Sequence, residues 1–242
     1  LNNHKTTLIL DPMMGRAMSE MLMRKCTTPS EAACGFKLIG KPAKSGSTEA
    51  IPSILKKQVK RAGTKSEIVV RIFSSALTER AAGNTGPGQD LKSENVWREF
   101  QKSLGTTSVV IYDGHGRYGA GPGFDTLEKP LKEDGKTIDR TRFDRFKTAL
   151  TGVSQKPELI MLAACNSLQN YSRDLKKISP ATTLLTTADD VQAPAAGMQT
   201  VFTVIDSVLA GRCETDLKAA LELVPDRADG YGPNGQITIE NF

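Results

Sequence analysis

The chain has 242 residues, a net charge of +5 and a pI of about 9.0, with 38% hydrophobic and 24% charged residues. This length allows one large domain, or one domain with an appendage. No stretch approaches the roughly 18 consecutive apolar residues of a membrane helix, so no membrane span is expected. The basic residues are scattered or lie on one expected helix face, and aromatic residues make up only 5% of the chain. We therefore expect no nucleic-acid partner.

The first 35 residues are expected to form an N-terminal helical appendage, and residues 36–242 one catalytic domain. In the appendage, a short strand at residues 6–10 precedes a methionine-rich helix at residues 13–25. Asp11 and Pro12 are typical of the start of such a helix, as its cap and its first residue.

From Phe36 onward, short apolar runs alternate with segments that have the 3.6-residue period of helices. Strands are expected at residues 36–39, 68–73, 109–113, 159–164, 181–187 and 235–240. Helices are expected at residues 48–62, 93–104 (capped by Ser93), 138–150, 168–177, 198–209 and 214–223. This alternation predicts an α/β fold, a doubly wound αβα sandwich with a mostly parallel sheet and helices on both faces.

Two of the expected strands end in residues that make a nucleophile and its base. One runs into Gly114-His115-Gly116, and the other ends at Cys165. In open parallel sheets, chemistry gathers beyond the carboxyl ends of the strands. A cysteine needs thiolate character to attack a carbonyl, and a nearby imidazole provides it. The backbone N–H groups of Gly116 and Cys165 are the candidate oxyanion-hole donors.

Other chemistries find less support in the sequence. Residues 114–119 spell G-x-G-x-x-G, but the glycine-rich residues after them cannot open the helix that a dinucleotide site needs. The chain has no G-x-x-x-x-G-K-[ST] and no G-x-S-x-G motif. It has only two histidines, and His4 lies near the terminus. We therefore expect neither a metal site nor a cofactor.

These strand ends resemble those of a known family. An apolar strand ending in His-Gly, followed by one ending in Ala-Cys-x-Ser, is similar to the caspase-like (clan CD) cysteine peptidases, nearest to the bacterial caspase-like, CHAT and clostripain-like groups. Cys165 follows His115 by 50 residues, and caspases have a similar spacing. The resemblance covers about residues 36–211. It implies a caspase-like fold and a cysteine endopeptidase that hydrolyses a peptide or protein substrate, with Cys165 as nucleophile and His115 as general base and acid.

The residues that would select the substrate differ from those of better-known members. Clostripain-like enzymes carry an acidic residue two positions before the cysteine for basic P1 selection, where this chain has Ala163. Asp189 and Asp190 leave the next strand, where the family's substrate loop lies. They are candidates for binding Arg or Lys at P1. The alternative is a solvated turn or helix cap.

The cysteines indicate in which cellular compartment the protein resides. Cys26 and Cys34 flank a loop-like stretch, which favours a local disulfide in an oxidising compartment; the alternative is two ordinary buried residues. The chain starts at Leu1 and not at a methionine. Removal of a secretory signal would explain this start, and so would a cloning choice. We therefore expect a secreted or periplasmic protein. The oligomeric state is not predicted.

Two other functions stay open. One is a catalytically inactive caspase-like module that only binds peptides. The other is an unrelated doubly wound domain, which predicts that the strand ends bearing His115 and Cys165 are not adjacent, with a Cα separation beyond about 10 Å.

Overall fold

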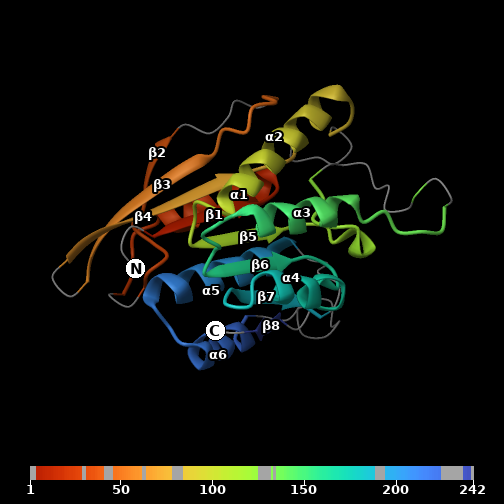
Figure 1. The fold of residues 1–242 in the computed structure, drawn as a ribbon. Coiled ribbons are helices and arrows are strands. Elements are labelled where there is room, and N and C mark those ends of the chain that lie inside the picture. Colours follow the sequence, from red (N-terminus) through yellow and green to blue (C-terminus); the bar gives the residue numbers. More distant parts are fainter. Residues whose placement is uncertain are drawn as a thin grey trace.

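The chain folds around an eight-stranded sheet, with the strand order β2-β3-β4-β1-β5-β6-β7-β8 in this computed structural model (Figure 1). The structure describes residues 4–28, 31–40, 46–61, 64–77, 84–124, 132, 135–188, 194–224 and 237–240. Strands β4, β1, β5, β6 and β7 are parallel, whereas β2, β3 and β8 are antiparallel to their neighbours. The expectation of a mostly parallel α/β sheet is confirmed. The strands are β1 (Lys5–Ile9), β2 (Lys37–Gly40), β3 (Ser53–Arg61), β4 (Thr64–Phe73), β5 (Val109–Asp113), β6 (Leu159–Ala163), β7 (Thr183–Thr187) and β8 (Ile237–Glu240).

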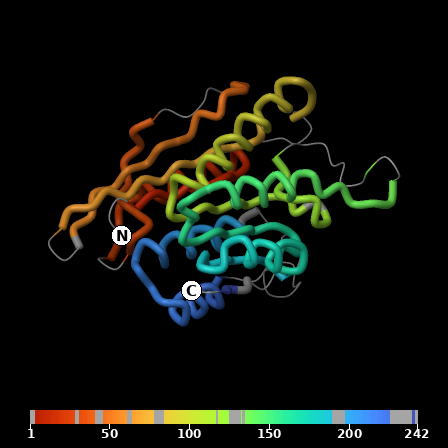
Figure 2. The backbone as a smooth tube through the Cα atoms, in the orientation of Figure 1, coloured from red at the N-terminus to blue at the C-terminus, as the bar shows by residue number. Residues whose placement is uncertain are grey.

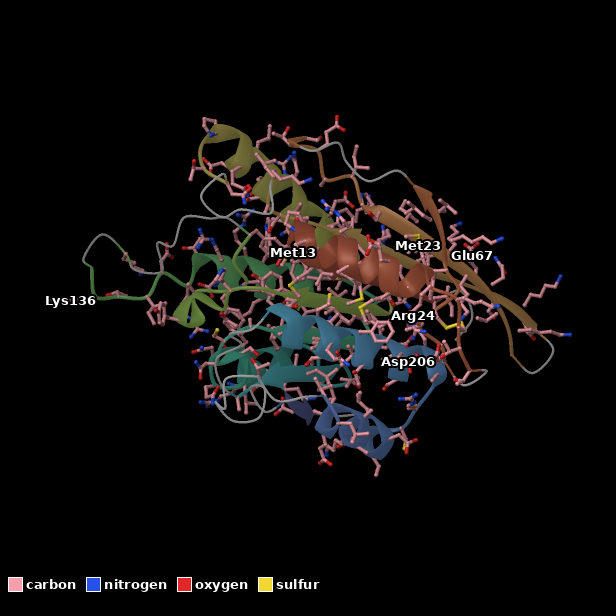
Figure 3. The ribbon with its side chains drawn as sticks, turned by 180° about the vertical axis from the view of Figure 1, so that it is seen from behind. Met13, Met23, Arg24, Glu67, Lys136 and Asp206 are labelled. Carbon is pink, nitrogen blue, oxygen red and sulfur yellow. A yellow bond between two sulfur atoms is a disulfide. The ribbon has the colours of Figure 1, made fainter. Side chains whose placement is uncertain are left out.

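Helices cover both faces of the sheet. Buried side chains of α1, α5 and α6 belong to one hydrophobic cluster, and those of α2, α3 and α4 belong to a second cluster on the other face. Figure 3 looks onto the first face, where α1 and α5 lie side by side. None of the described helices is long and apolar enough to cross a membrane. The helices are α1 (Pro12–Met23), α2 (Pro87–Ser103), η2 (Arg117–Gly119), α3 (Thr141–Gly152), η3 (Leu168–Ser172), α4 (Arg173–Ile178), α5 (Pro194–Ala210) and α6 (Glu214–Glu222).

Side chains of the central strands alternate between these two clusters. In β5, Val109 and Ile111 pack in the cluster under α1 and α5, whereas Val110 and Tyr112 pack in the cluster under α2 and α3. Successive residues of a strand point to opposite faces. Asp113, the last residue of β5, is therefore placed on the α1/α5 side of the sheet.

Strand β1 lies at the centre of the sheet. It pairs in parallel with residues 69–73 of β4 on one side and with residues 109–112 of β5 on the other. Leu8, in the middle of β1, is fully buried. The expectation that residues 1–35 form an appendage is therefore wrong, because these residues supply a central strand and a helix of the main core.

The segment 48–62 was expected to be a helix, but its residues Ser53–Arg61 form strand β3. It pairs antiparallel with β4 over nine residue pairs. Leu55 is buried and Val59 packs on the α1/α5 cluster, which is the two-residue alternation of a strand. Adjacent apolar residues Ile54 and Leu55 also fit a helical period, which misled the sequence-based expectation. The outer half of the β3–β4 hairpin extends past the end of β1 (Figure 2).

Two helices begin at other residues than expected. Helix α2 starts at Pro87, so Ser93 is not its cap but lies inside it, where its hydroxyl donates to the Phe124 carbonyl. Proline suits the first turn of a helix, and here this start signal outweighs the polar cap further along. Helix α3 begins at Thr141 and not at Ile138. The first change shortens the loop before α2, and the second lengthens the loop before α3.

Cys26 and Cys34 form a disulfide, which decides between the two alternatives that the sequence left open. The loop that it closes is bound to α5, because the Asp206 carboxylate accepts hydrogen bonds of 2.9 Å from the backbone N–H groups of Ala32 and Ala33. Asp206 lies on the face seen in Figure 3. The disulfide and the carboxylate together fix the connection between α1 and β2.

Removing this disulfide is expected to lower thermal stability. For a loop with a sequence separation of 8, the cross-link stabilises the fold by about 2–3 kcal/mol. The double variant Cys26→Ala/Cys34→Ala should therefore melt roughly 5–10 °C below wild type in thermal unfolding followed by circular dichroism. Cys213→Ala, at an exposed free cysteine, is the control and should leave the midpoint unchanged. Equal midpoints for the double variant and the control would contradict this role.

Candidate active site

The two strands that carry the candidate dyad are neighbours in the sheet. Strands β5 and β6 run parallel in register, and their last pair is Asp113 with Ala163. His115 and Cys165 each lie two residues beyond this pair. The two chains stay together past it, because the Gly114 N–H donates to the Ala163 carbonyl at 3.1 Å. The wide separation that an unrelated domain predicts between these strand ends is not found.

Gly116 lies directly against the backbone of Cys165. A Cβ atom at position 116 would be 2.5 Å from the Cys165 carbonyl oxygen and 3.2 Å from its nitrogen, so no side chain fits there. Gly116 is buried, whereas His115 is exposed and Cys165 is half-buried. The glycine after the histidine thus permits the closest approach of the two turns, while the histidine and cysteine residues both face solvent in part.

The turn after Cys165 is tightly held. Asn166 has a φ of 53°, in the left-handed region that residues with a Cβ atom seldom adopt. The fully buried Ser167 donates its hydroxyl to the Leu162 carbonyl at 2.7 Å and accepts the Thr187 N–H at 2.8 Å. Ser167 therefore ties the turn to both β6 and β7.

Two buried tyrosines hold the loop after His115. Tyr112 donates to the carbonyls of Gly123 at 2.6 Å and His115 at 3.1 Å. Tyr171, from the helix that follows Cys165, donates to the Gly116 carbonyl and accepts the Gly121 N–H. Burial raises the pKa of Tyr171 to about 12, so it stays a hydroxyl donor at neutral pH.

Sequence reasoning gave neither tyrosine a role at the site. Their partners are backbone groups of the loop after His115, and no local sequence pattern marks such pairs. Tyr112 is 11 residues from its Gly123 partner, and Tyr171 is 55 residues from Gly116. The nearest available signal is that Tyr112 follows three apolar residues in an expected core strand.

Asp113 is the charged residue at the end of the otherwise apolar strand β5. The residue as a whole is half-buried, but its Oδ2 atom is shielded from solvent and has no hydrogen-bond partner in the described part of the chain. Burial raises the pKa of Asp113 to about 7, and the nearby Asp11 carboxylate adds to this rise. Asp11 itself caps α1 by accepting the Met14 N–H at 2.8 Å. Two acidic residues thus share the α1 side of the strand ends.

The remaining candidate residues lie elsewhere. Asp189 and Asp190 lie outside the described residues, so their expected role in P1 selection stays a prediction. His4 is buried just before β1, at the edge of the sheet opposite to the strand ends that bear His115, and it bonds to the Thr6 hydroxyl at 2.8 Å. His115 is thus the only one of the chain's two histidines at this edge.

One cluster among the described residues has the donor types of a metal site. Sulfur and carboxylate atoms of Cys26, Glu31 and Cys34 lie within 4.8 Å of one another. Both sulfur atoms are joined in the disulfide, so neither is a thiolate that binds a metal ion. Glu31 instead bonds to Thr27 and Arg24, and these hydrogen bonds lower its pKa to about 2.

Comparison with known proteins assigns no family to the chain. No protein-family model matches the sequence, and no curated protein matches it either. The chemistry of the site is therefore argued from its own residues.

Tyr171→Phe is expected to loosen the contact between the two turns. The change removes the donor to Gly116 and leaves the buried Gly121 N–H without its acceptor, at a cost of about 1–3 kcal/mol. The unfolding midpoint should fall by several degrees, as measured by differential scanning calorimetry. Tyr118→Phe is the matched control, because Tyr118 is 74% exposed, and it should leave the midpoint unchanged.

Asp113→Asn is expected to stabilise the protein at alkaline pH. The unfolded chain releases this proton near 3.8 and the folded chain only near 7. The folded state therefore binds more protons between these values, and its stability falls as the pH rises through them. The neutral amide of Asn does not titrate, so the variant does not lose stability as the pH rises. It should melt several degrees above wild type at about pH 8, with a smaller difference in melting temperature at about pH 4.5.

Thermal melts at the two pH values check this, with Asp144→Asn as control because that carboxylate is exposed. An Asp113→Asn melting profile parallel to that of wild type at both pH values would show that the carboxyl is not held in an unfavourable site.

Proposed function

We propose that the protein is a cysteine endopeptidase that hydrolyses peptide bonds through Cys165 and His115. The observation that supports this most is the register of β5 and β6, which brings the two residues to equivalent positions beyond neighbouring strand ends. The resemblance of these strand ends to caspase-like peptidases points to the same chemistry. A caspase-like fold within the α/β class is part of the proposal.

In this reaction the Cys165 sulfur attacks the carbonyl carbon of the substrate, while His115 accepts the thiol proton. The tetrahedral intermediate then collapses as the C–N bond breaks, and His115 gives its proton to the leaving amine. A water molecule attacks the resulting thioester after losing a proton to His115. The C–S bond breaks, and the thiol regains its proton as the acid product leaves.

The backbone N–H groups of Gly116 and Cys165 are proposed to stabilise the oxyanion. Their support is the contact between the two turns, in which the Cβ-less Gly116 lies against Cys165. Donors fixed before the reaction stabilise developing charge without reorganisation. The hydrogen bonds from Tyr112 and Tyr171 to the His115 and Gly116 carbonyls hold the orientation of this turn.

The proposed setting is extracellular or periplasmic, and the proposed partner is a peptide or protein substrate. The Cys26–Cys34 disulfide supports an oxidising compartment. Cys165 and Cys213 are both outside the disulfide, so the proposed nucleophile is not a partner in it.

Selective alkylation tests the nucleophile. Cys213 is exposed, whereas Cys165 is half-buried. Exposure alone therefore predicts that Cys213 is modified faster. If His115 activates Cys165, a limiting amount of iodoacetamide at about pH 6.5 should modify Cys165 at least about tenfold faster. Peptide mass spectrometry of the two tryptic fragments measures both rates in one sample. In His115→Ala the order should reverse.

Hydrolysis of a mixed peptide library, read by mass spectrometry, tests the activity itself. Wild type should cleave members of the library, Cys165→Ala should cleave none, and His115→Ala should be slower by about 10²–10⁴-fold. Cys213→Ala is the control and should retain full activity. Equal alkylation rates for the two cysteines together with an uncleaved library would overturn the proposal in favour of a caspase-like module that only binds peptides.

A further inference from the structure

The β2–β3–β4 part of the sheet is packed against helix α1 on one side only. On the α1 side, Leu55 of β3 is buried and Val59 packs on the hydrophobic cluster. On the other side, Phe73 is the one described residue of these three strands that belongs to the cluster under α2, α3 and α4. Figure 1 looks onto this second side, and no described helix lies in front of the β3–β4 hairpin there. This side of the hairpin is therefore open to a partner.

Lysines gather on the open side. Because successive residues of a strand point to opposite faces, Lys56 and Lys60 of β3 lie on the face that α1 does not cover. Register partners in an antiparallel pair share a face, so Lys65 of β4 lies beside Lys60, and Lys37 of β2 lies beside Lys56. We call this surface, made of Lys37, Lys56, Lys60 and Lys65, the lysine face.

Most of the charge on the lysine face has no countercharge. Glu67 is the acidic residue of these three strands, and its carboxylate pairs with the Lys56 ammonium group at 2.9 Å. Lys37, Lys60 and Lys65 are exposed and form no ion pair with a described residue. Three positive charges are thus presented to solvent on one side of the sheet.

Two pairs of these lysines lie directly opposite each other across neighbouring strands. Lys60 is the register partner of Lys65, and Lys37 is the register partner of Lys56. The Cβ atoms of such partners are about 4.5–5.5 Å apart, and like charges at this distance destabilise a sheet. A negatively charged partner removes the repulsion, so its binding also stabilises the hairpin.

The shape and composition of the lysine face favour a lipid surface over other anionic partners. The aromatic residue of these strands, Phe73, is buried under the helices, so the face offers no ring on which a nucleic-acid base could stack. Lysine ammonium groups are compact charges, and anionic headgroups attract them without a fixed geometry. Ile39, two residues after Lys37 in β2, is 56% exposed and supplies an apolar side chain for the membrane interface.

We propose that the lysine face binds the surface of an anionic lipid bilayer. Residues 64–68 of β4 precede its first pair with β1, whereas His115 and Cys165 follow the last residues of β5 and β6. The lysine face and the candidate active site therefore lie toward opposite ends of the parallel strands. A protein bound in this way keeps the candidate active site accessible to solvent. The inference does not depend on the proposed peptidase activity.

Cosedimentation with vesicles tests the binding. Wild type should bind phosphatidylcholine vesicles that contain about 30% phosphatidylglycerol at least about 10²-fold more tightly than vesicles of phosphatidylcholine alone. Raising the salt concentration from about 0.1 M to about 1 M shortens the reach of a charge from about 10 Å to about 3 Å, and should abolish this preference. Equal binding to both kinds of vesicle at low salt would refute the proposal.

The triple variant Lys37→Gln/Lys60→Gln/Lys65→Gln tests the surface. A lysine near an anionic membrane contributes about fivefold in affinity, so the variant should bind the anionic vesicles about 10²-fold more weakly than wild type. The substitutions remove like charges from exposed positions. Its melting temperature, followed by circular dichroism, should therefore be no lower than that of wild type, which separates a loss of binding from a loss of folding.

A matched control separates the lysine face from net charge. The variant Lys102→Gln/Lys177→Gln/Lys218→Gln loses the same three charges from exposed positions on α2, α4 and α6. It should bind anionic vesicles within about threefold of wild type, because charges more than about 10 Å from the membrane are screened. An equal loss of affinity in both triple variants would show that net charge drives the binding, and would rule out a dedicated surface.

Two further measurements examine the alternatives. Lysines in edge strands also keep sheets from pairing edge to edge. If that is their only role, the Lys37/Lys60/Lys65 variant will self-associate in size-exclusion chromatography and still bind vesicles as wild type does, which contradicts the proposal. Poly-glutamate represents an acidic protein partner, and tighter binding of wild type to poly-glutamate than to anionic vesicles would overturn the assignment to lipid.

Discussion

The parallel register of β5 and β6 is the constraint on which the candidate site depends. Because Asp113 pairs with Ala163, His115 and Cys165 each follow the same register pair by two residues, at neighbouring strand ends. The hydrogen bond from Gly114 to Ala163 extends the pairing beyond the strands, and Gly116 closes it by packing on Cys165. A slip of one residue would separate the histidine and the cysteine and turn their side chains to opposite faces.

The two faces of the sheet make different contributions to this edge. On the α2/α3/α4 side, Tyr112 and Tyr171 bond to backbone carbonyls and hold the loop after the histidine in one conformation. On the α1/α5 side, Asp11 and Asp113 bring negative charge next to the same strand ends. The hydrogen bonds on the α2/α3/α4 side therefore hold the loop rigidly and stabilise the fold. The acidic residues on the α1/α5 side supply charge and lower the stability of the fold. Such a division is typical of sites where function and stability oppose each other.

Much of the central sheet could be predicted from the sequence, because strands such as β5 and β6 are short apolar runs that end at clear turn residues. The equivalent strand-end positions of His115 and Cys165 followed from the same runs. Strand β3 was missed because its lysines and paired apolar residues also fit a helix, and only pairing with β4 decides between the two. The central place of β1 was missed because its partners are about 60 and 100 residues away in the sequence.

The site's supporting residues were missed for a related reason. Tyr171 bonds to a carbonyl 55 residues away, and the pKa of Asp113 is raised by burial and by the charge of Asp11, while Gly197 of α5 lies close to its carboxylate. Sequence patterns report the period of a single element, whereas these contacts arise from the packing of several. The residues that perform the proposed chemistry were therefore easier to find than those that position them.

The place of β1 has a consequence for how the protein is made. The strand that joins the β2–β3–β4 half of the sheet to the β5–β8 half is made before the other strands of the sheet, yet one of its partners, β5, follows about 100 residues later. Until β5 is made, Leu8 and the other residues of β1 lack one of the two strands that pair with β1. Loop closure over such separations is slow, and unpaired strand edges invite aggregation. The nascent chain is thus most exposed to misassembly before β5 emerges, and loss of the first nine residues would divide the sheet into two unconnected halves.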